Sequence, residues 1–235
     1  MKLINQKRSI IPSLDVSSLD RALTIVKETA YVESVSAYKI GFSLALRYSL
    51  PKVVEEIKQI CPNKPVIYDH QKAGTDIPDT GDDFMQICKS AGVDATIIFP
   101  LSGIATQKAW IKSAIDIDLR IIVGGMMTHP GFTTDNGGYL DPNAIMDVYR
   151  TAIIHEIEDF VVPGTKPEFV KNLVTTLFEN ESIEPVFYSP GLITQGGNVS
   201  EMSEILKYDW HAIVGRKIKD ANDIQKSVKE IEVLL

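Results

Sequence analysis

The chain has 235 residues, of which 44% are hydrophobic and 23% are charged, and its formal net charge is -7. These proportions are typical of a globular protein, and a chain of this length can form one α/β barrel. The negative charge argues against general binding to nucleic acid or to an anionic membrane, since both require a positive field. A protein of negative net charge can still contain a local cationic pocket that binds a small anionic ligand.

The cysteines and the N-terminal segment narrow the class of protein further. The only cysteines, Cys61 and Cys88, form no C-x-x-C pair. We therefore expect two buried free thiols, and neither a disulfide framework nor a zinc motif. Residues 1–10 lack the apolar run of a signal peptide, and no stretch approaches ~18 consecutive apolar residues. The sequence thus predicts a cytoplasmic protein that does not associate with membranes.

Short apolar runs alternate with amphipathic stretches along the whole chain. Each run is too short for a helix and is rich in Val, Ile, Phe or Tyr, as buried parallel strands are. The runs cover residues 9–14, 37–41, 65–68, 95–99, 120–124, 160–162, 185–188 and 212–214. A stretch of helical period follows each run, as in residues 19–32. Asp141 and Asp220 stand where helix N-caps are expected, and the stretch from Thr165 to Glu168 has the spacing of a capping box.

Eight β–α units without a linker or a low-complexity tract predict a single (β/α)8 barrel domain that spans residues 1–235. A doubly wound open sheet is the alternative, but such a sheet more often has fewer strands or a second domain. In a barrel, the residues that carry chemistry lie at the C-terminal ends of the strands. Polar residues follow six of the predicted strands: Asp15, Lys39, Asp69, Lys72, Thr128, His129, Ser189, Thr194, Gln195 and Arg216.

The last two predicted strands are followed by residues suited to phosphate. Gln195 precedes two glycines, and Gly215 precedes Arg216. Glycine lets the backbone approach an anion, and the guanidinium fork of arginine matches phosphate oxygens. The alternative is a flexible glycine loop beside a solvated charge, although a cation at a helix start is mildly unfavourable.

Several motifs along the chain carry a family resemblance. They are Leu14-Asp15, Tyr38-Lys39-Ile40-Gly41, Asp76-Ile77-Pro78-Asp79-Thr80, Met127-Thr128-His129-Pro130-Gly131, Pro163-Gly164-Thr165-Lys166-Pro167-Glu168, Ser189-Pro190-Gly191, Gln195-Gly196-Gly197 and Ala212-Ile213-Val214-Gly215-Arg216. In this order and spacing, the chain resembles the orotidine 5′-phosphate decarboxylase family, in its short microbial and archaeal form, nearly from end to end.

The resemblance implies an enzyme without a cofactor or a metal that converts a nucleotide monophosphate, orotidine 5′-phosphate, to UMP by removing CO2 from C6 of the pyrimidine. It also implies a homodimer whose active sites lie at the subunit interface. The catalytic residues that it implies are Lys39, Asp69, Lys72 and Asp76, and the substrate-binding residues are Asp15, Thr80, Thr128, Pro190, Gln195, Gly215 and Arg216. Asp76 and Thr80 would reach the site of the partner subunit.

The spacing of the charged residues departs from the D-x-K-x-x-D pattern of the family. Asp69 and Lys72 are three positions apart, and Lys72 and Asp76 are four apart. Because side chains alternate along a strand, groups three apart point to opposite faces. A bulge at His70 and Gln71 would restore a common face, which is the first hypothesis. Alternatively His70 takes the place of the carboxylate, or Lys72 leaves the site.

Other interpretations stay open. The stretch after Tyr68 could be a loop with solvated charges, in which Asp79 or Thr80 caps the next helix. The protein could be a magnesium-dependent lyase or decarboxylase of the hexulose-phosphate synthase or ketogulonate-phosphate decarboxylase kind, with Glu33 as a candidate ligand, or a non-catalytic binder of a phosphorylated ligand. No two histidines have metal-ligand spacing, and we expect His211 to lie at the surface.

Overall fold

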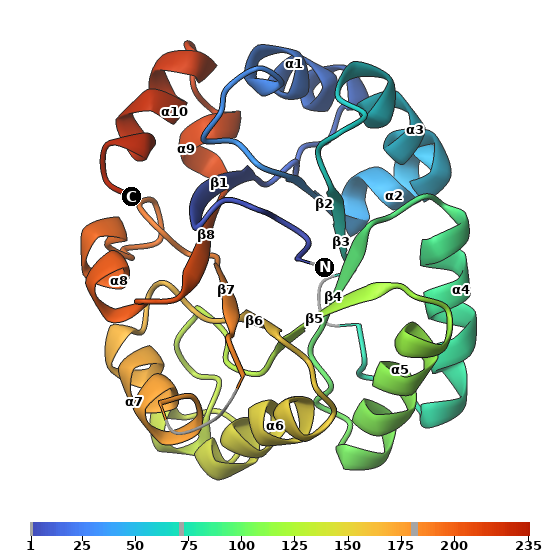
Figure 1. Ribbon diagram of the computed structural model, residues 1–235, viewed down its shortest axis with the longest axis vertical. Helices are drawn as coiled ribbons and strands as arrows, with labels where there is room; N and C mark the ends of the chain where they lie inside the picture. The colour runs from blue at the N-terminus through green and yellow to red at the C-terminus, as the bar shows by residue number, and fades with distance from the viewer. Residues whose placement is uncertain (1, 71–72, 180–182) are drawn as a thin grey trace.

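Eight parallel strands surround the centre of the molecule, and the helices form an outer ring (Figure 1). The structure, a computed structural model, describes residues 2–70, 73–179 and 183–235. The strands are β1 (Arg8–Pro12), β2 (Tyr38–Gly41), β3 (Val66–Asp69), β4 (Ala95–Ile98), β5 (Arg120–Gly124), β6 (Asp159–Val161), β7 (Val186–Ser189) and β8 (Asp209–Val214). Each of them overlaps one of the predicted apolar runs.

The ring closes between β1 and β2. The sheet order runs from β1 through β8 and down to β2, with parallel pairing at every step. Parallel bridges from Ile10 to Val35 and from Ser13 to Lys39 join the two ends. The amide of Leu14 also donates to the carbonyl oxygen of Lys39 at 2.8 Å. The predicted (β/α)8 barrel is therefore confirmed, and the open sheet is wrong.

Helices follow the strands in chain order. They are α1 (Leu19–Thr29), α2 (Phe42–Tyr48), α3 (Leu50–Ile60), α4 (Gly81–Ser90), α5 (Ile104–Asp116), α6 (Pro142–Ile154), α7 (Pro167–Leu177), α8 (Val199–Ile205), α9 (Arg216–Lys219) and α10 (Ile224–Glu232), with short 3-10 helices η1 (Pro78–Thr80) and η2 (Thr134–Asn136). None of the helices in the described part of the chain is both long and apolar enough to cross a membrane.

The alternation of side chains along the strands creates two apolar cores. One fills the barrel and includes Ile11, Ile67, Ile97, Ile122 and Ile213. The other lies between the strands and the surrounding helices. Since successive residues of a strand point to opposite faces, a side chain at the C-terminal end of a strand lies either in the barrel mouth or under a helix.

Some local predictions are confirmed and others are wrong. The side chain of Asp141 caps α6 by accepting from the amide of Asn143 at 2.7 Å. Asp220 ends α9, however, and the N-cap of α10 is Asp223. Thr165 caps no helix either, because Lys166 is the N-cap residue of α7 and the Thr165 hydroxyl instead donates to the carbonyl oxygen of Thr128 at 2.9 Å. A tertiary contact thus redirects Thr165, which local spacing assigns to a cap.

The buried groups include both cysteines and one histidine. Cys61 and Cys88 are buried free thiols, as predicted. The prediction for His211 is wrong, because its side chain is fully buried in the barrel, where the hydroxyl of Ser9 lies 2.7 Å from Nδ1. Its position on β8 places it on the same face as Ile213, which belongs to the core that fills the barrel.

Candidate active site

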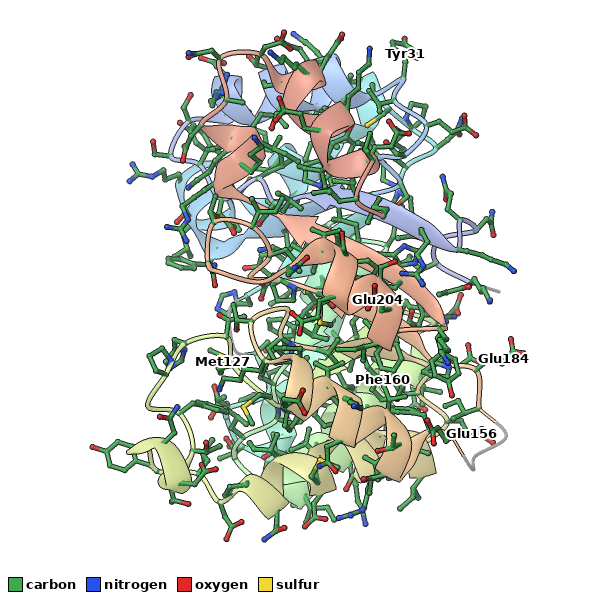
Figure 2. The ribbon with its side chains drawn as sticks, turned by 90° about the vertical axis from the view of Figure 1, so that its left-hand side faces the viewer. Tyr31, Met127, Glu156, Phe160, Glu184 and Glu204 are labelled. Atoms are coloured by element: carbon green, nitrogen blue, oxygen red, sulfur yellow. The ribbon has the colours of Figure 1, made fainter. Side chains whose placement is uncertain are left out.

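A cavity of 350 Å³ lies at the C-terminal ends of the strands. It is lined by most of the predicted site residues, namely Asp15, Lys39, Asp69, Thr128, Pro190, Gln195, Gly215 and Arg216. Met127, another lining residue, lies at one end of the barrel in Figure 2, and Glu156 lies at the opposite end. The fold thus gathers residues from widely separated parts of the sequence into one mouth.

Lys39 is the centre of a charge cluster in this cavity. Its ammonium donates to Oδ2 of Asp69 at 3.0 Å and to Oδ2 of Asp15 at 3.1 Å. The side chain of Lys39 is only 5% exposed, and those of Asp69 and Asp15 are 15% and 36% exposed. Burial by itself would lower the pKa of Lys39, but the charges and hydrogen bonds of Asp69 and Asp15 outweigh it and raise the pKa. Lys39 is therefore a positive charge at neutral pH.

The register of β3 decides which side chain meets Lys39. Lys39 pairs with Ile67, and the side chain of Ile67 lies in the core that fills the barrel. Asp69 is two residues further on, so it points to the same side and reaches the mouth. His70 points the other way. Its ring lies edge-on to Phe84 of α4, and its Nδ1 hydrogen-bonds to the hydroxyl of Tyr68. Asp69, and not His70, therefore lies beside Lys39 in the cavity.

The loops after β7 and β8 form another part of the cavity. Arg216 begins α9, and its guanidinium donates to the carbonyl oxygen of Thr194 at 3.1 Å. Gln195 and Gly215 line the same space, while the side chain of Arg216 stays exposed. An exposed guanidinium bonded to a neutral carbonyl keeps its positive charge, so this end of the cavity suits an anion.

The loop after β7 packs closely on the loop after β5. At Gly191, where φ is +89°, a Cβ would lie 2.8 Å from Cγ2 of Thr128. A side chain at position 191 would therefore displace Thr128 or the adjoining loop. Pro190 and Thr128 thus lie on neighbouring parts of one wall of the cavity.

Two of the predicted residues, Asp76 and Thr80, are not among the described residues that line this cavity. Lys72 lies outside the described residues. Asp76 and Thr80 follow β3 at the surface, where the carboxylate of Asp76 accepts from the amide of Ile77 at 2.8 Å and the hydroxyl of Thr80 donates to the carbonyl oxygen of Ile77 at 2.9 Å. In the described structure, Asp76 and Thr80 therefore lie outside the lining of the cavity of their own chain.

The structure adds two polar residues that the sequence reasoning missed. The hydroxyl of Ser13 donates to Oδ2 of Asp15 at 2.6 Å, and the ammonium of Lys219 donates to the backbone carbonyl oxygen of Asp15 at 3.0 Å. Both line the cavity. Ser13 stands two residues before Asp15, so strand alternation could have placed the two side chains on one face. No local pattern relates Lys219 to Asp15, because they are 204 residues apart.

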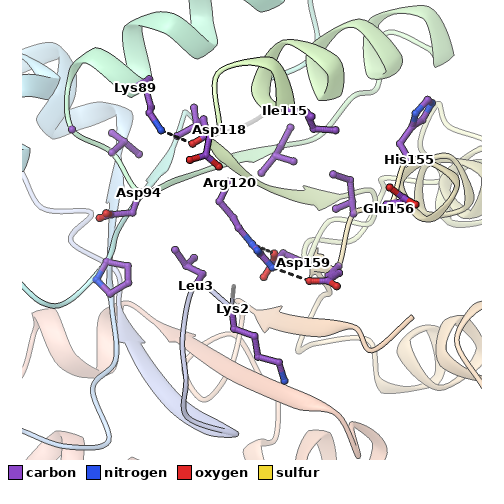
Figure 3. Close-up of a pocket in the computed structure, with 17 residues that line it drawn as sticks. Lys2, Leu3, Lys89, Asp94, Ile115, Asp118, Arg120, His155, Glu156 and Asp159 are labelled. Atoms are coloured by element: carbon purple, nitrogen blue, oxygen red, sulfur yellow. Dashed lines mark hydrogen bonds and ion pairs between the residues drawn. The ribbon is translucent and has the colours of Figure 1, made fainter. Parts of the chain in front are cut away.

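A larger cavity of 790 Å³ lies at the other end of the barrel, around the starts of β4, β5 and β6 (Figure 3). In this cavity, Nε of Arg120 donates a hydrogen bond to Oδ2 of Asp159 at 2.5 Å. The ammonium of Lys89 donates to the backbone carbonyl oxygen of Asp118. Arg120 and Asp159 thus neutralise each other, and Lys89 is held by a carbonyl group. Active sites of these barrels lie at the C-terminal ends of the strands. We therefore assign the candidate site to the smaller cavity.

The described residues contain no group of three or more His, Cys, Asp or Glu side chains that is arranged to hold a metal ion. Glu33, the candidate ligand of the magnesium-dependent alternative, is exposed and does not line the cavity. The described part of the cavity offers one buried cation, Lys39, between two carboxylates, together with Arg216 and Lys219 from the segment after β8.

Comparison with known proteins places this site in a family. The sequence model of the orotidine 5′-phosphate decarboxylase / HUMPS family matches residues 8–231. The orotidine 5′-phosphate decarboxylase of Methanococcus maripaludis is 30% identical over 222 residues, which cover 94% of each chain. That of Methanocaldococcus jannaschii is 30% identical over 223 residues, which cover 95% of this chain and 96% of the relative.

A solved structure resembles the whole chain as well. The crystal structure of orotidine 5′-monophosphate decarboxylase from Methanocaldococcus jannaschii, complexed with the inhibitor BMP, has a TM-score of 0.83 and 28% sequence identity. The match covers 97% of this chain and 98% of the other. Sequence and fold therefore agree over nearly the full length, and the chain belongs to the orotidine 5′-phosphate decarboxylase / HUMPS family.

Proposed function

We propose that this protein removes CO2 from orotidine 5′-phosphate to give UMP in pyrimidine biosynthesis, without a metal or an organic cofactor. The observation that carries the proposal is the buried ammonium of Lys39, bonded to Asp15 and Asp69 in a cavity that also contains Arg216. The family membership, and the activity named for relatives that match nearly the whole chain, support it.

The chemistry of the cavity residues suggests how the substrate is held. The phosphate group would bind Gln195, Gly215 and Arg216, because the guanidinium offers paired donors to phosphate oxygens. The ribose would bind Asp15 and Lys39. Thr128 and Pro190 would contact the pyrimidine. This placement brings the carboxylate on C6 towards Asp69.

Decarboxylation leaves an electron pair on C6 that no neighbouring carbonyl group can delocalise. A nearby ammonium stabilises this carbanion increasingly as the charge develops, and can then protonate it. Asp69 disfavours the carboxylate of the bound substrate by repulsion, and this repulsion is relieved when CO2 leaves. The two effects bind the transition state better than the ground state. We assign the ammonium to Lys72, while Lys39 holds Asp69 and Asp15 in place.

We also propose that residues 1–235 form one domain, that the protein acts as a cytoplasmic homodimer, and that Asp76 and Thr80 enter the active site of the partner subunit. The exposed position of Asp76 supports the proposal that its segment enters the site of the partner subunit. So does an apolar groove of 330 Å³ between α5 and α6, beside Ile104, which is 59% exposed. Exposed apolar surface of this kind is common where subunits associate.

The test is an assay of purified protein with orotidine 5′-phosphate in the presence of a metal chelator. Release of CO2 and formation of UMP would support the proposal. Activity on a sugar phosphate that magnesium restores after chelation would favour the magnesium-dependent alternative. Binding of UMP without any turnover of orotidine 5′-phosphate would favour a non-catalytic binder.

A further inference from the structure

The segment after β3, from Asp76 to Gly81, is hydrogen-bonded to α5 through two buried side chains. The hydroxyl of Thr106 donates to the backbone carbonyl oxygen of Asp76 at 2.8 Å. The indole Nε1 of Trp110 donates to the backbone carbonyl oxygen of Ile77 at 3.1 Å. Thr106 and Trp110 are 3% and 4% exposed, and they are four residues apart, so they lie on one face of α5. Two consecutive peptide groups are therefore fixed by neighbouring donors.

The indole of Trp110 also supports the end of this segment. A Cβ on Gly81, the first residue of α4, would lie 2.7 Å from Cδ1 of Trp110. The backbone thus passes directly against the indole ring. The ring of Phe84 stacks on the indole ring of Trp110, with 5.0 Å between the ring centroids. Trp110 therefore holds the segment at Ile77 and again at Gly81.

The same contacts leave the side chains of Asp76 and Ile77 on the outside of the subunit. Asp76 and Ile77 are exposed, although their carbonyl groups are held by buried donors. The active-site cavity of the same chain includes neither Asp76 nor Thr80. A backbone that is held by buried donors while the carboxylate of Asp76 stays exposed is arranged to present this carboxylate to a group outside the subunit.

We propose that Thr106 and Trp110 are positioning residues that set the place of Asp76 in the active site of the second subunit. The inference rests on the proposed function, in which Asp76 acts across the dimer interface. A charged group near the reacting atoms must be placed within a fraction of an ångström, so a shift of its backbone reduces the rate. Thr106 and Trp110 touch no substrate and act only through the Asp76–Ile77 backbone.

The first test compares Thr106→Val with Thr106→Ser and with Thr29→Val. Valine keeps the shape of threonine but removes the donor, so kcat/KM should fall about 10-fold, and serine should restore most of the loss. Thr29 is also fully buried, donates to the carbonyl oxygen of Ile25 at 2.7 Å and contacts the Tyr38 hydroxyl at 2.9 Å. Thr29→Val should lower the melting temperature but leave kcat/KM unchanged. An unchanged kcat/KM in Thr106→Val, or an equal loss in Thr29→Val, would overturn the inference.

The second test uses hybrid dimers, isolated through two different affinity tags. One subunit carries Thr106→Val and the other carries Asp69→Asn. One site then combines both defects, while the other has an intact cavity and an intact Asp76 segment. The hybrid should recover about half of the wild-type activity, well above the activity of either parent homodimer.

The outcomes separate this inference from the proposed function. A hybrid no more active than the mean of its parents would place the effect of Thr106 within its own subunit and overturn the inference alone. A wild-type protein that is monomeric at assay concentration would overturn it too, while leaving the decarboxylase activity in place. A wild-type protein that does not turn over orotidine 5′-phosphate would refute both.

Discussion

The ammonium of Lys39 donates to the carboxylate of Asp69 across 3.0 Å, from one strand of the barrel to the next. This bond shows which side chain of the altered stretch after β3 lies beside Lys39. Asp69 faces the mouth with Ile67, and His70 packs outside the barrel against Phe84. Of the three hypotheses for the spacing, the one that places His70 in the site is wrong. The placement of Lys72 remains a prediction, because Lys72 lies outside the described residues.

Asp69→Asn should lower kcat roughly 100-fold, since the change removes a charged partner of Lys39 and the repulsion on the substrate carboxylate. The measurement is steady-state release of CO2. His70→Ala is the matched control on the neighbouring residue, and should keep kcat within about threefold. A larger loss in His70→Ala than in Asp69→Asn would contradict the assignment.

Lys72→Ala should abolish turnover while the protein still folds and binds UMP. The reason is that the variant lacks the ammonium proposed to stabilise and protonate the C6 carbanion. Isothermal titration with UMP, alongside the turnover assay, separates loss of chemistry from loss of folding. Measurable turnover in this variant at more than about 1% of the wild-type rate would exclude Lys72 as the proton donor.

Arg216→Ala should weaken binding of UMP by roughly 2–4 kcal/mol and leave binding of uridine nearly unchanged. The guanidinium is expected to contact only the phosphate group, which uridine lacks. Calorimetric titration with both ligands provides the comparison. Equal losses for the two ligands would mean that Arg216 supports the loop through its bond to Thr194 instead of binding phosphate.

Tyr149→Phe should lower the free energy of unfolding by about 2–3 kcal/mol. The hydroxyl of Tyr149 is fully buried, donates to the carbonyl oxygen of Val161 at 2.8 Å and accepts from the amides of Gly125 and Met126 at 3.1 and 3.3 Å. Its removal leaves these backbone groups without that partner. Urea denaturation measures the effect, and Tyr31→Phe, at a side chain that is 97% exposed, should cost almost nothing.

The stability of the protein should fall as the pH drops from about 6.5 to about 4 because of His211. Burial lowers its pKa to about 4, with Lys2 and Arg8 adding to the shift and Asp209 opposing it. In that pH range the unfolded chain binds a proton at His211 that the folded protein does not, so folding loses about 3 kcal/mol at about 1.4 kcal/mol per pH unit. Urea titrations from pH 7 to pH 4 should give a smaller loss for His211→Asn. Parallel pH profiles for the two proteins would contradict this.

The sequence by itself determined the architecture and most of the cavity. Eight apolar runs separated by stretches of helical period predict parallel strands that need helices on their outer side, because each run is buried on both faces. Once the barrel is inferred, its geometry brings the ends of the strands together, and Asp15, Lys39 and Arg216 follow as neighbours. These predictions depend on local periodicity, which a sequence displays directly.

Tertiary structure decided the features that depend on distant partners. Spacing alone left Asp69 and His70 as competing choices, and the pairing of β3 with β2 selected Asp69. The burial of His211 became evident only when β8 closed against β1 and brought Ser9 to its ring. Likewise, the contacts of Thr106 and Trp110 with the segment after β3 join residues 30 and 33 positions apart. Such contacts depend on how elements pack, and no pattern of neighbouring residues records that packing.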